Sequence, residues 1–501
     1  MNPAYGITAV MFVVVAGVLI GFFGLRLSRT TSDFYVASRT VSPLWNASAI
    51  GGEYLSAASF LGVAGLILAY GADMLWLPVG WTGGYLVLLV LVSAPLRRSG
   101  AYTLPDFAEA RLSSMTVRRT ASVLVVLIGW LYLMPQFQSA GLVLRTITGA
   151  PEWIGGVVVA VAVAVNVLSG GMRSITFVQA FQYWLKLTAL GVPVVFLLIA
   201  WASDDVSQLP ARDMTTWAVP LAGGREYPLY STYSLILATF LGTMGLPHVL
   251  VRFYTNPDGR AARRTTLVVL SLLGMFYLLP AVYGALGRLY APDLVTSGRT
   301  DEVVLTLPAR LIGGTPGELL TALVTAGAFA AFLSTSSGLT VSVAGVVAQD
   351  LLGGGVRAFR RATVLAVAGP LLLATTTRSL PVADVVGLAF AVAASSFCPL
   401  LVLGIWWWRL TSAGAMAGLL AGGGLACAAG LATIVVGPHS GLAGALLAQP
   451  AAWTVPVAFL VMIVVSLATQ NRLPADVARI MVRLHTPETV NVNRGDWRPR
   501  S

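Results

Sequence analysis

The chain is dominated by long apolar stretches that alternate with short polar or arginine-containing segments. Most stretches approach or exceed the roughly 20 residues that an α-helix needs to cross a bilayer. The pattern therefore predicts an all-α polytopic membrane protein with about thirteen transmembrane helices and no soluble domain. The predicted helices lie at residues 5–25, 44–70, 74–95, 120–144, 153–168, 176–201, 231–250, 265–287, 318–348, 362–377, 382–405, 413–436 and 451–469.

The second predicted helix contains a polar interruption within residues 47–63, ASAIGGEYLSAASFLGV. Gly51 and Gly52 stand side by side, and each weakens a helix by about 1 kcal/mol relative to alanine. Glu53 follows them, and an acid at membrane depth is costly unless it faces a cavity or a partner. The stretch predicts a helix that breaks near the membrane midplane and presents polar groups. The alternative is a helix kinked only for packing, with Glu53 bonded to a neighbouring helix.

A second interruption is predicted in the seventh helix, where Gly242, Thr243, Gly245 and Pro247 cluster. Interrupted helices in corresponding positions of two repeats are the best sequence pointer to a transporter binding site. The two interrupted helices are five apart, which predicts a five-plus-five inverted repeat with discontinuous helices.

The repeats divide the chain into six predicted segments. A first helix precedes the repeats, and two additional helices and a tail follow them. The segments are 1–43 (first helix and cytoplasmic loop), 44–202 (first repeat), 203–230 (extracytoplasmic loop), 231–405 (second repeat), 406–469 (two additional helices) and 470–501 (cytoplasmic tail).

Composition agrees with a membrane protein: 57% of residues are hydrophobic and 10% are charged, against about 25% charged in soluble domains. The two cysteines lie in apolar runs and imply no disulfide framework. The three histidines are too scattered for a metal site, and the sequence has neither an HExxH pair nor an acid dyad. These features argue against an enzyme, and no cofactor is expected.

The net charge of +11 reflects membrane topology rather than nucleic-acid binding. One set of alternating loops holds 23 arginines and the other holds seven. The positive-inside rule places the arginine-rich set in the cytoplasm. We therefore expect a multi-pass protein of the plasma (inner) membrane, in contact with lipid, with its N-terminus outside and its C-terminus inside.

The ninth helix carries a run of hydroxyls from Ser334 to Ser337. A dehydrated monovalent cation needs several oxygen ligands, and carbonyls freed by a helix break together with such hydroxyls can supply them. Small-residue packing between helices is the alternative explanation for the run.

Glu53 and Lys186, the only lysine, are the two charges predicted to lie well inside the membrane. Glu53 is expected beside the cation site. Lys186 has three open interpretations: a counter-charge for the substrate, a partner for Glu53, or a side chain that snorkels to the inner surface.

The sequence resembles the solute:sodium symporter family over most of its length, and within it the cation/acetate (monocarboxylate) branch. The resemblance is carried by GGEYLSAASFLG, SGGMRSITFVQ, GTMGLPHVLVRFYTNPDGRAAR, AFAAFLSTSSGL, VAQDLL and ASSFCPLLVLGIWWWRLTSAGAMAG. It implies a leucine-transporter-like fold and a sodium ion between the second and ninth helices. By position, the implied ligands are the carbonyls of Gly52, Leu55 and Ala331 and the hydroxyls of Ser334 and Thr335.

The sequence also departs from the family. Gln179 stands where some members have an aspartate for cation passage, which leaves a second cation site in doubt. Ala58 and Ser59 occupy the positions of the polar pair of the sugar branch, so sugar is not expected.

A carboxylate substrate needs hydrogen-bond donors or positive charge. Freed backbone N–H groups at the start of a half-helix supply both, near Ser56 and Ser59 and again near Thr243 and Gly245. The hydroxyls of Tyr54 and Thr243 are further candidates.

These observations and the resemblance predict a sodium-coupled symporter that imports acetate, propionate or pyruvate, with Na⁺ as the coupling ion. Proton coupling through Glu53, or uptake of an amino acid or urea, remains an alternative. A transport-like sensor would need a signalling domain that a tail of about 30 residues cannot hold. The oligomeric state is open.

Overall fold

The computed structural model describes residues 3–25, 41–204, 217–219, 226–377, 382–437 and 440–487, and every regular element in these ranges is a helix. The predicted first cytoplasmic loop, most of loop 203–230 and the end of the tail lie outside the described residues.

The helices follow the apolar stretches closely, with short 3₁₀ and π turns between some of them. Those in the first half are α1 (Pro3–Leu25), α3 (Pro43–Tyr54), α4 (Val63–Tyr70), α5 (Trp76–Val87), α6 (Ser93–Ser99), α7 (Leu104–Leu112), α8 (Met115–Thr148) and α9 (Glu152–Ala202). Those in the second half are α11 (Pro228–Gly245), α12 (Pro247–Val251), α13 (Gly259–Tyr290), α14 (Asp293–Thr296), α15 (Val303–Leu311), α16 (Gly314–Asp350), α17 (Gly355–Thr376), α18 (Val382–Trp406), α19 (Ser412–Gly418), α20 (Leu425–Val436), α21 (Gly441–Ala448), α22 (Ala451–Ala468) and α23 (Val477–His485).

The apolar segment Ala58–Ser99 folds back on itself at Gly71, whose φ of +77° suits a residue without a side chain. Ser59 and Trp81 both contact Tyr277, through a 3.0 Å hydrogen bond and a 5.7 Å ring stacking respectively. Ser59 and Trp81, which lie before and after the turn, are therefore at the same height in the bundle. The segment forms two antiparallel arms.

Helix α9 also bends back. A Cβ atom at Gly17 of α1 would lie 3.7 Å from Asn166 Nδ2 and 3.8 Å from Gln182 Nε2. Sixteen residues of straight helix would separate those two positions by about 24 Å. Both side chains can approach one glycine only if α9 turns sharply between them.

Eleven helices in the described part of the chain are long and apolar enough to cross a membrane, which makes this a multi-pass membrane protein. One of the eleven is the folded-back segment Ala58–Ser99, and the first arm of α9, Glu152–Leu168, falls below the length limit. The number thirteen stays a prediction.

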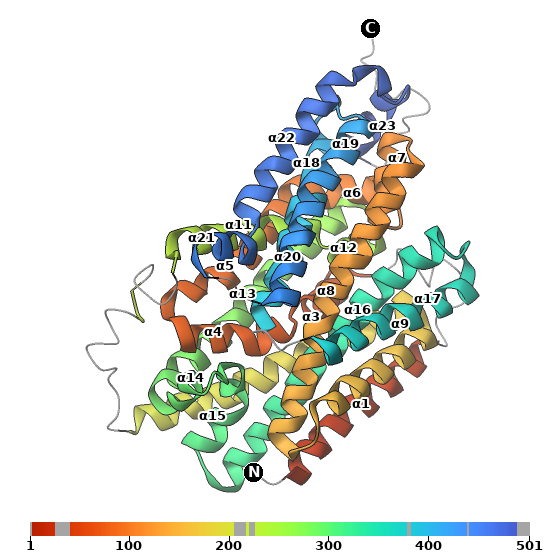
Figure 1. Cartoon of the computed structure of the whole chain (residues 1–501). Helices are drawn as coiled ribbons and strands as arrows, with labels where there is room; N and C mark the ends of the chain where they lie inside the picture. Colours follow the sequence, from red (N-terminus) through yellow and green to blue (C-terminus); the bar gives the residue numbers. More distant parts are fainter. Residues whose placement is uncertain are drawn as a thin grey trace.

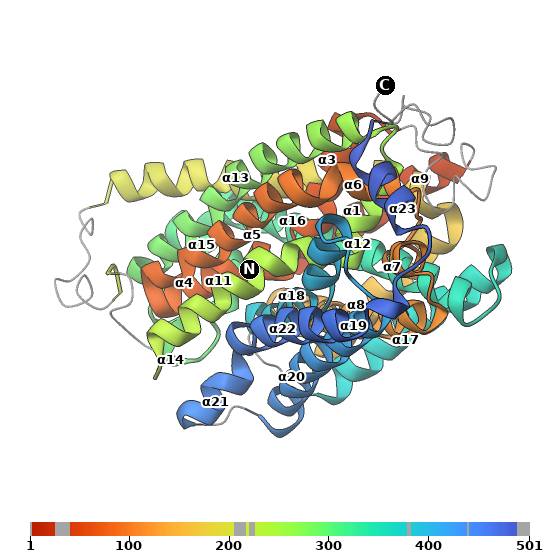
Figure 2. The same cartoon turned by 90° about the horizontal axis from the view of Figure 1, so that it is seen from above.

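The interrupted helices pack against long helices of the bundle, α3 against α9, α13 and α16 and α11 against α5, α18 and α22. Helix α16 packs against α3, α8, α9 and α17, while α18 packs against α8, α11 and α22. Helices α19 to α22 gather on one flank, seen from above in Figure 2, so the additional helices lie outside the central group.

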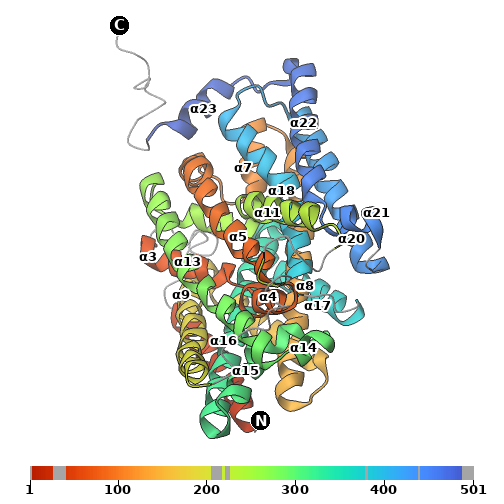
Figure 3. The same cartoon turned by 90° about the vertical axis from the view of Figure 1, so that its left-hand side faces the viewer.

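The two ends of the bundle differ in which elements they hold. Helices α6, α7 and α23 lie at one end, and α14, α15 and the start of α1 lie at the other (Figures 1 and 3). The arginines of α6, α7 and α23 therefore collect at one end, as the topology prediction requires; which side of the membrane this end faces stays a prediction.

Candidate functional site

The first helix break has the predicted form. Helix α3 ends at Tyr54, and a π turn at Ala58–Gly62 leads into α4. The Ala57 N–H donates to Gln136 Oε1 of α8 across 3.0 Å. The break is therefore held open by a side chain of another helix instead of being closed by helical hydrogen bonds.

Glycine is required at Gly52, just before this break. A Cβ there would lie 2.2 Å from the backbone oxygen of Gln179 on α9, closer than real atoms approach. The pair of glycines thus allows α9 to pack directly against the break.

The second break separates α11 from α12 at Leu246, whose φ of −73° and ψ of 117° are extended. Gly245 packs against α18, where a Cβ would lie 2.4 Å from the Ala393 carbonyl oxygen. The Tyr54 hydroxyl lies 2.7 Å from Thr243 Oγ1. This contact joins the two interrupted helices directly.

Lys186 of α9 is fully buried and points into the first break. Its Nζ donates to the carbonyl oxygens of Gly52 and Leu55, the latter across 2.7 Å, and to Ser334 Oγ across 2.8 Å. These three acceptors belong to the predicted sodium ligands. The snorkelling interpretation is wrong, because the ammonium group lies among polar groups of the protein interior.

The other two predicted ligands lie nearby on α16. Thr335 Oγ1 donates to the Glu53 carbonyl oxygen across 2.6 Å, and the Ala331 carbonyl accepts from Ser334 Oγ at 3.1 Å. The structure thus brings all five predicted ligands together, yet they do not fit a sodium ion as arranged here. The Lys186 ammonium already takes the space between three of them.

Glu53 pairs with Arg252 rather than with Lys186. Arg252 Nε lies 2.8 Å from Glu53 Oε2, and the side chains are 1% and 2% exposed. The guanidinium also donates to Thr176 Oγ1 at 2.8 Å and to Gln179 Oε1. Of the three interpretations left open for Lys186, pairing with Glu53 is therefore not the one observed: Glu53 forms a buried ion pair with Arg252 within a wider polar network.

The predicted seventh helix ends at residue 250, which puts Arg252 in the cytoplasmic loop that follows it. The burial of Arg252 shows that this prediction was wrong. Arg252 follows Pro247 of the second break by only five residues. Its neighbours Val251 and Phe253 are apolar, and this was the available signal that it remains within the bundle.

The three buried charges do not balance. Glu53 carries one negative charge, whereas Arg252 and Lys186 each carry a positive charge when ionised. A buried charge without a counter-charge is costly, so this group favours the approach of an anion.

Aromatic rings surround the space between the breaks. The ring centroids of Tyr54, Trp81 and Tyr132 lie 6.1, 5.7 and 5.9 Å from that of Phe390 on α18. Tyr85 packs edge-on to Tyr54 at 4.9 Å. The predicted substrate region is therefore rich in packed aromatic rings, which suit contact with a small apolar group.

Several buried polar atoms of this region lack a hydrogen-bond partner within the described residues. They are Trp81 Nε1, Tyr85 Oη and both ring nitrogens of His248. The His248 ring lies edge-on to Tyr132 at 5.3 Å. Unpaired buried donors are costly, so these atoms suit a polar ligand. Trp81, Tyr85 and His248 were missed by sequence reasoning, since nothing local marks them.

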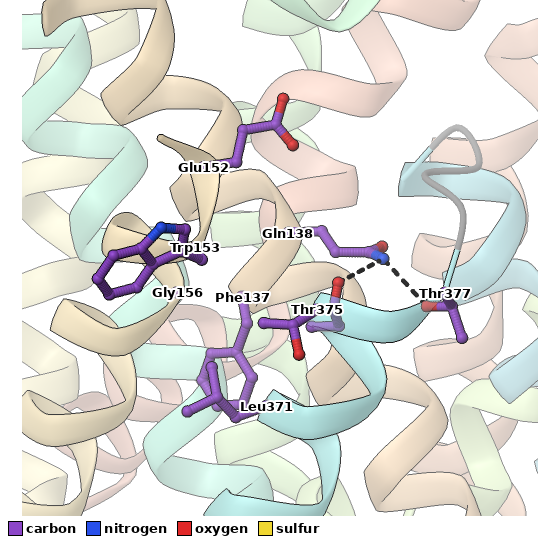
Figure 4. A pocket seen from close by; sticks show the side chains of 9 residues that line it. Phe137, Gln138, Glu152, Trp153, Gly156, Leu371, Thr375 and Thr377 are labelled. Carbon is purple, nitrogen blue, oxygen red and sulfur yellow. Dashed lines mark hydrogen bonds between the residues drawn. The ribbon is translucent and has the colours of Figure 1, made fainter. Parts of the chain in front are cut away.

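Two cavities open beside α8 and α9 at the end of the molecule that holds α14. The larger, about 310 Å³, is lined by residues that include Arg145, Arg299 and Asp301. The smaller, about 170 Å³, shares Gln138 and Glu152 with it (Figure 4).

Gln138 of α8 lines both cavities. The Gln138 amide donates to the Ala374 carbonyl and Thr377 Oγ1 of the α17 end, each at 3.3 Å (Figure 4). Gln138 is only two residues from Gln136, whose side chain holds the break. Helix α8 thus lines both cavities and, two residues earlier, contacts the first break.

Comparison with proteins of known sequence supplies a family. Residues 34–422 match the Sodium:solute symporter family. The chain is 33% identical over 433 residues to the "Uncharacterized symporter YwcA" of Bacillus subtilis, covering 82% of this chain and 83% of that protein. It is 31% identical over 463 residues to a "Monocarboxylic acid transporter" of Corynebacterium glutamicum, covering 84% and 82%.

Solved structures show the same fold at low sequence identity. A Na⁺-coupled sialic acid symporter superposes with a TM-score of 0.71 at 14% identity, covering 92% of this chain and 98% of that one. The nucleobase-cation symporter Mhp1 superposes with a TM-score of 0.57 at 13% identity, and the match covers 91% of this chain and 99% of that one. MhsT, solved with L-phenylalanine, superposes with a TM-score of 0.52 at 14% identity, and the match covers 84% of this chain and 98% of that one.

The fold is therefore the leucine-transporter-like inverted repeat with discontinuous helices, and the protein is a transporter, not an enzyme. Membership of such a family implies coupling to sodium. The match over most of the chain and the two interrupted helices lead to one conclusion: this protein belongs to the sodium:solute symporter family.

Proposed function

We propose that this protein is a secondary active symporter that imports a short-chain monocarboxylate such as acetate, propionate or pyruvate. The observation that carries the proposal is the burial of two basic side chains, Lys186 and Arg252, with a single carboxylate, Glu53, which gives an excess positive charge when all three are ionised. A monovalent anion neutralises that excess and leaves no buried charge uncompensated.

The surroundings of these charges favour a small carboxylate. Trp81, Tyr85 and His248 offer unpaired polar atoms for its oxygens, and Phe390 with the rings around it offers apolar contact for a short chain. The Corynebacterium relative named as a monocarboxylic acid transporter supports the same substrate class.

The alternative substrates suit the site less well. An amino acid brings an ammonium group that needs an acidic partner, but Arg252 already neutralises Glu53. Urea is neutral and would leave the excess positive charge without a counter-charge.

Uptake by proteoliposomes tests the proposal. Labelled acetate, propionate and pyruvate are compared with L-alanine and urea, with inward sodium and proton gradients imposed separately. We expect saturable uptake of the carboxylates only, with mutual competition among them. Because neutral acids cross bilayers unaided, protein-free liposomes are the control. Uptake of L-alanine or urea without carboxylate uptake would refute the proposed substrate class.

A further inference from the structure

The Lys186 side chain occupies the position at which the family's coupling ion is expected. An ammonium group has three N–H donors and no acceptor. Its three acceptors here are two carbonyls of the first break and one hydroxyl of α16. Every donor of Lys186 is thereby satisfied by an atom that was predicted to bind sodium.

The packing of α9 explains why Lys186 reaches this point. Gln179 lies seven residues, or about two helical turns, before Lys186, so both project from similar faces of α9. The backbone of Gln179 packs directly against Gly52, and its Nε2 donates to the Ser334 carbonyl at 2.7 Å. The same face of α9 therefore contacts both the break and α16, and Lys186 bridges them.

A lysine in this position does what a bound monovalent cation would do. It carries one positive charge, and it links the carbonyls of the break to α16 through Ser334. Unlike an ion, it is covalently attached to α9 and cannot dissociate.

We infer that the Lys186 ammonium substitutes for sodium at this site, so that this transporter holds the first break against α16 without a sodium ion there. The inference deepens the proposed function, because it concerns the cation that accompanies the carboxylate. It is a disagreement between this chain and the sodium coupling implied by its family.

Thermal unfolding of the purified protein in sodium chloride and in choline chloride of equal concentration tests the inference without any carboxylate. Wild-type protein should unfold at the same temperature in both salts, within about 1 °C. Lys186→Ala removes the ammonium and leaves the oxygens, so it should be less stable in choline and regain several degrees as sodium is added. Lys186→Ala combined with Ser334→Ala should lose that recovery.

Gln182→Ala, one turn before Lys186 and equally buried, is the matched control and should show no sodium effect. If Lys186→Ala fails to fold, Lys186→Met preserves the length of the side chain, and the wild-type protein still decides the question through binding of radioactive sodium. Saturable sodium binding by the wild type that Ser334→Ala abolishes would overturn the inference. So would a folded Lys186→Ala protein that sodium does not stabilise. If the binding results are as expected while carboxylate uptake fails, the substrate proposal falls and the inference stands.

Discussion

At the residue scale, the chemistry of the site rests on three charges that the sequence only partly revealed. Glu53 stood out because an acid between apolar runs is rare, and Lys186 because it is the only lysine. Their partners could not be read from the sequence, because they come from helices far along the chain. Arg252 resembled the start of a loop since Asn256, Pro257 and further arginines follow it.

The Glu53–Arg252 pair predicts strong coupling between two substitutions. Arg252→Met leaves a buried carboxylate without its partner and should destabilise the protein by about 3–5 kcal/mol. Glu53→Gln added to Arg252→Met removes the unpaired charge, so the double variant should recover a large part of that loss. Thermal unfolding of the two single variants and the double variant measures the coupling; purely additive effects would show that the pair is energetically unimportant.

The Tyr54 hydroxyl is predicted to act on substrate more than on folding. Thr243 Oγ1 also donates to the Thr239 carbonyl at 2.7 Å, so it keeps a partner in Tyr54→Phe. Stability should fall by only about 0.5–1.5 kcal/mol, while the KM for pyruvate uptake should rise about 3- to 10-fold. Tyr283→Phe, another fully buried tyrosine, is the control and should leave KM unchanged. An unchanged KM in Tyr54→Phe would remove this hydroxyl from the substrate site.

Asp301, in the segment between α14 and α15, predicts a pH-dependent stability. Burial raises the pKa of its carboxyl from 3.8 to about 6, and the negative charges of Asp384 and Glu302 add to the rise. The folded state therefore holds this proton more tightly than the unfolded chain does. The contribution of this proton to the free energy of unfolding is fully present below pH 4 and is lost as the pH rises through 6. The ionised carboxyl then lowers the stability by an amount on the order of 1–3 kcal/mol.

Asp301→Asn should consequently raise the unfolding temperature at pH 8 and change little near pH 4.5. Asp293→Asn at the start of α14 is the control, because the Arg310 guanidinium lowers the pKa of Asp293. That variant should not be stabilised at pH 8. If Asp301→Asn differed from the wild type in stability by the same amount at both pH values, the raised pKa of Asp301 would not be the cause of the pH dependence.

At the element scale, the apolar pattern was enough to predict both helix breaks, because adjacent glycines and a proline act locally. The pattern could not reveal that α9 bends back or that its far arm inserts Lys186 into the first break. Those features depend on contacts between segments more than a hundred residues apart in the chain.

The close approach of α9 to the first break predicts a sharp difference between two glycines. Gly52→Ala would force a methyl group against the Gln179 carbonyl, so we expect loss of uptake and poor folding. Gly274→Ala on α13 meets nothing within 4 Å and should be neutral or stabilising by up to about 1 kcal/mol. Expression level, thermal unfolding and uptake check both variants. A Gly52→Ala protein with normal uptake would contradict the packing described for the break.

At the scale of the whole molecule, the arginine distribution predicts which end faces the cytoplasm. Cysteines introduced at Ser203 and at Arg357, both exposed, lie in loops predicted to be outside and inside respectively. The native cysteines Cys398 and Cys427 are buried and should label weakly. An impermeant thiol reagent should label position 203 in intact cells and position 357 only after permeabilisation; the reverse pattern would invert the topology.

We propose that this transporter carries a short monocarboxylate and that Lys186 takes the place of sodium. Pyruvate counterflow tests both parts in one measurement, because exchange needs no ion gradient. Proteoliposomes loaded with unlabelled pyruvate are diluted into a trace of labelled pyruvate, with either choline or sodium on both sides. We expect equal transient accumulation by the wild type in both salts, and accumulation by Lys186→Ala only in sodium. Wild-type counterflow that requires sodium, or none in either salt, would contradict it.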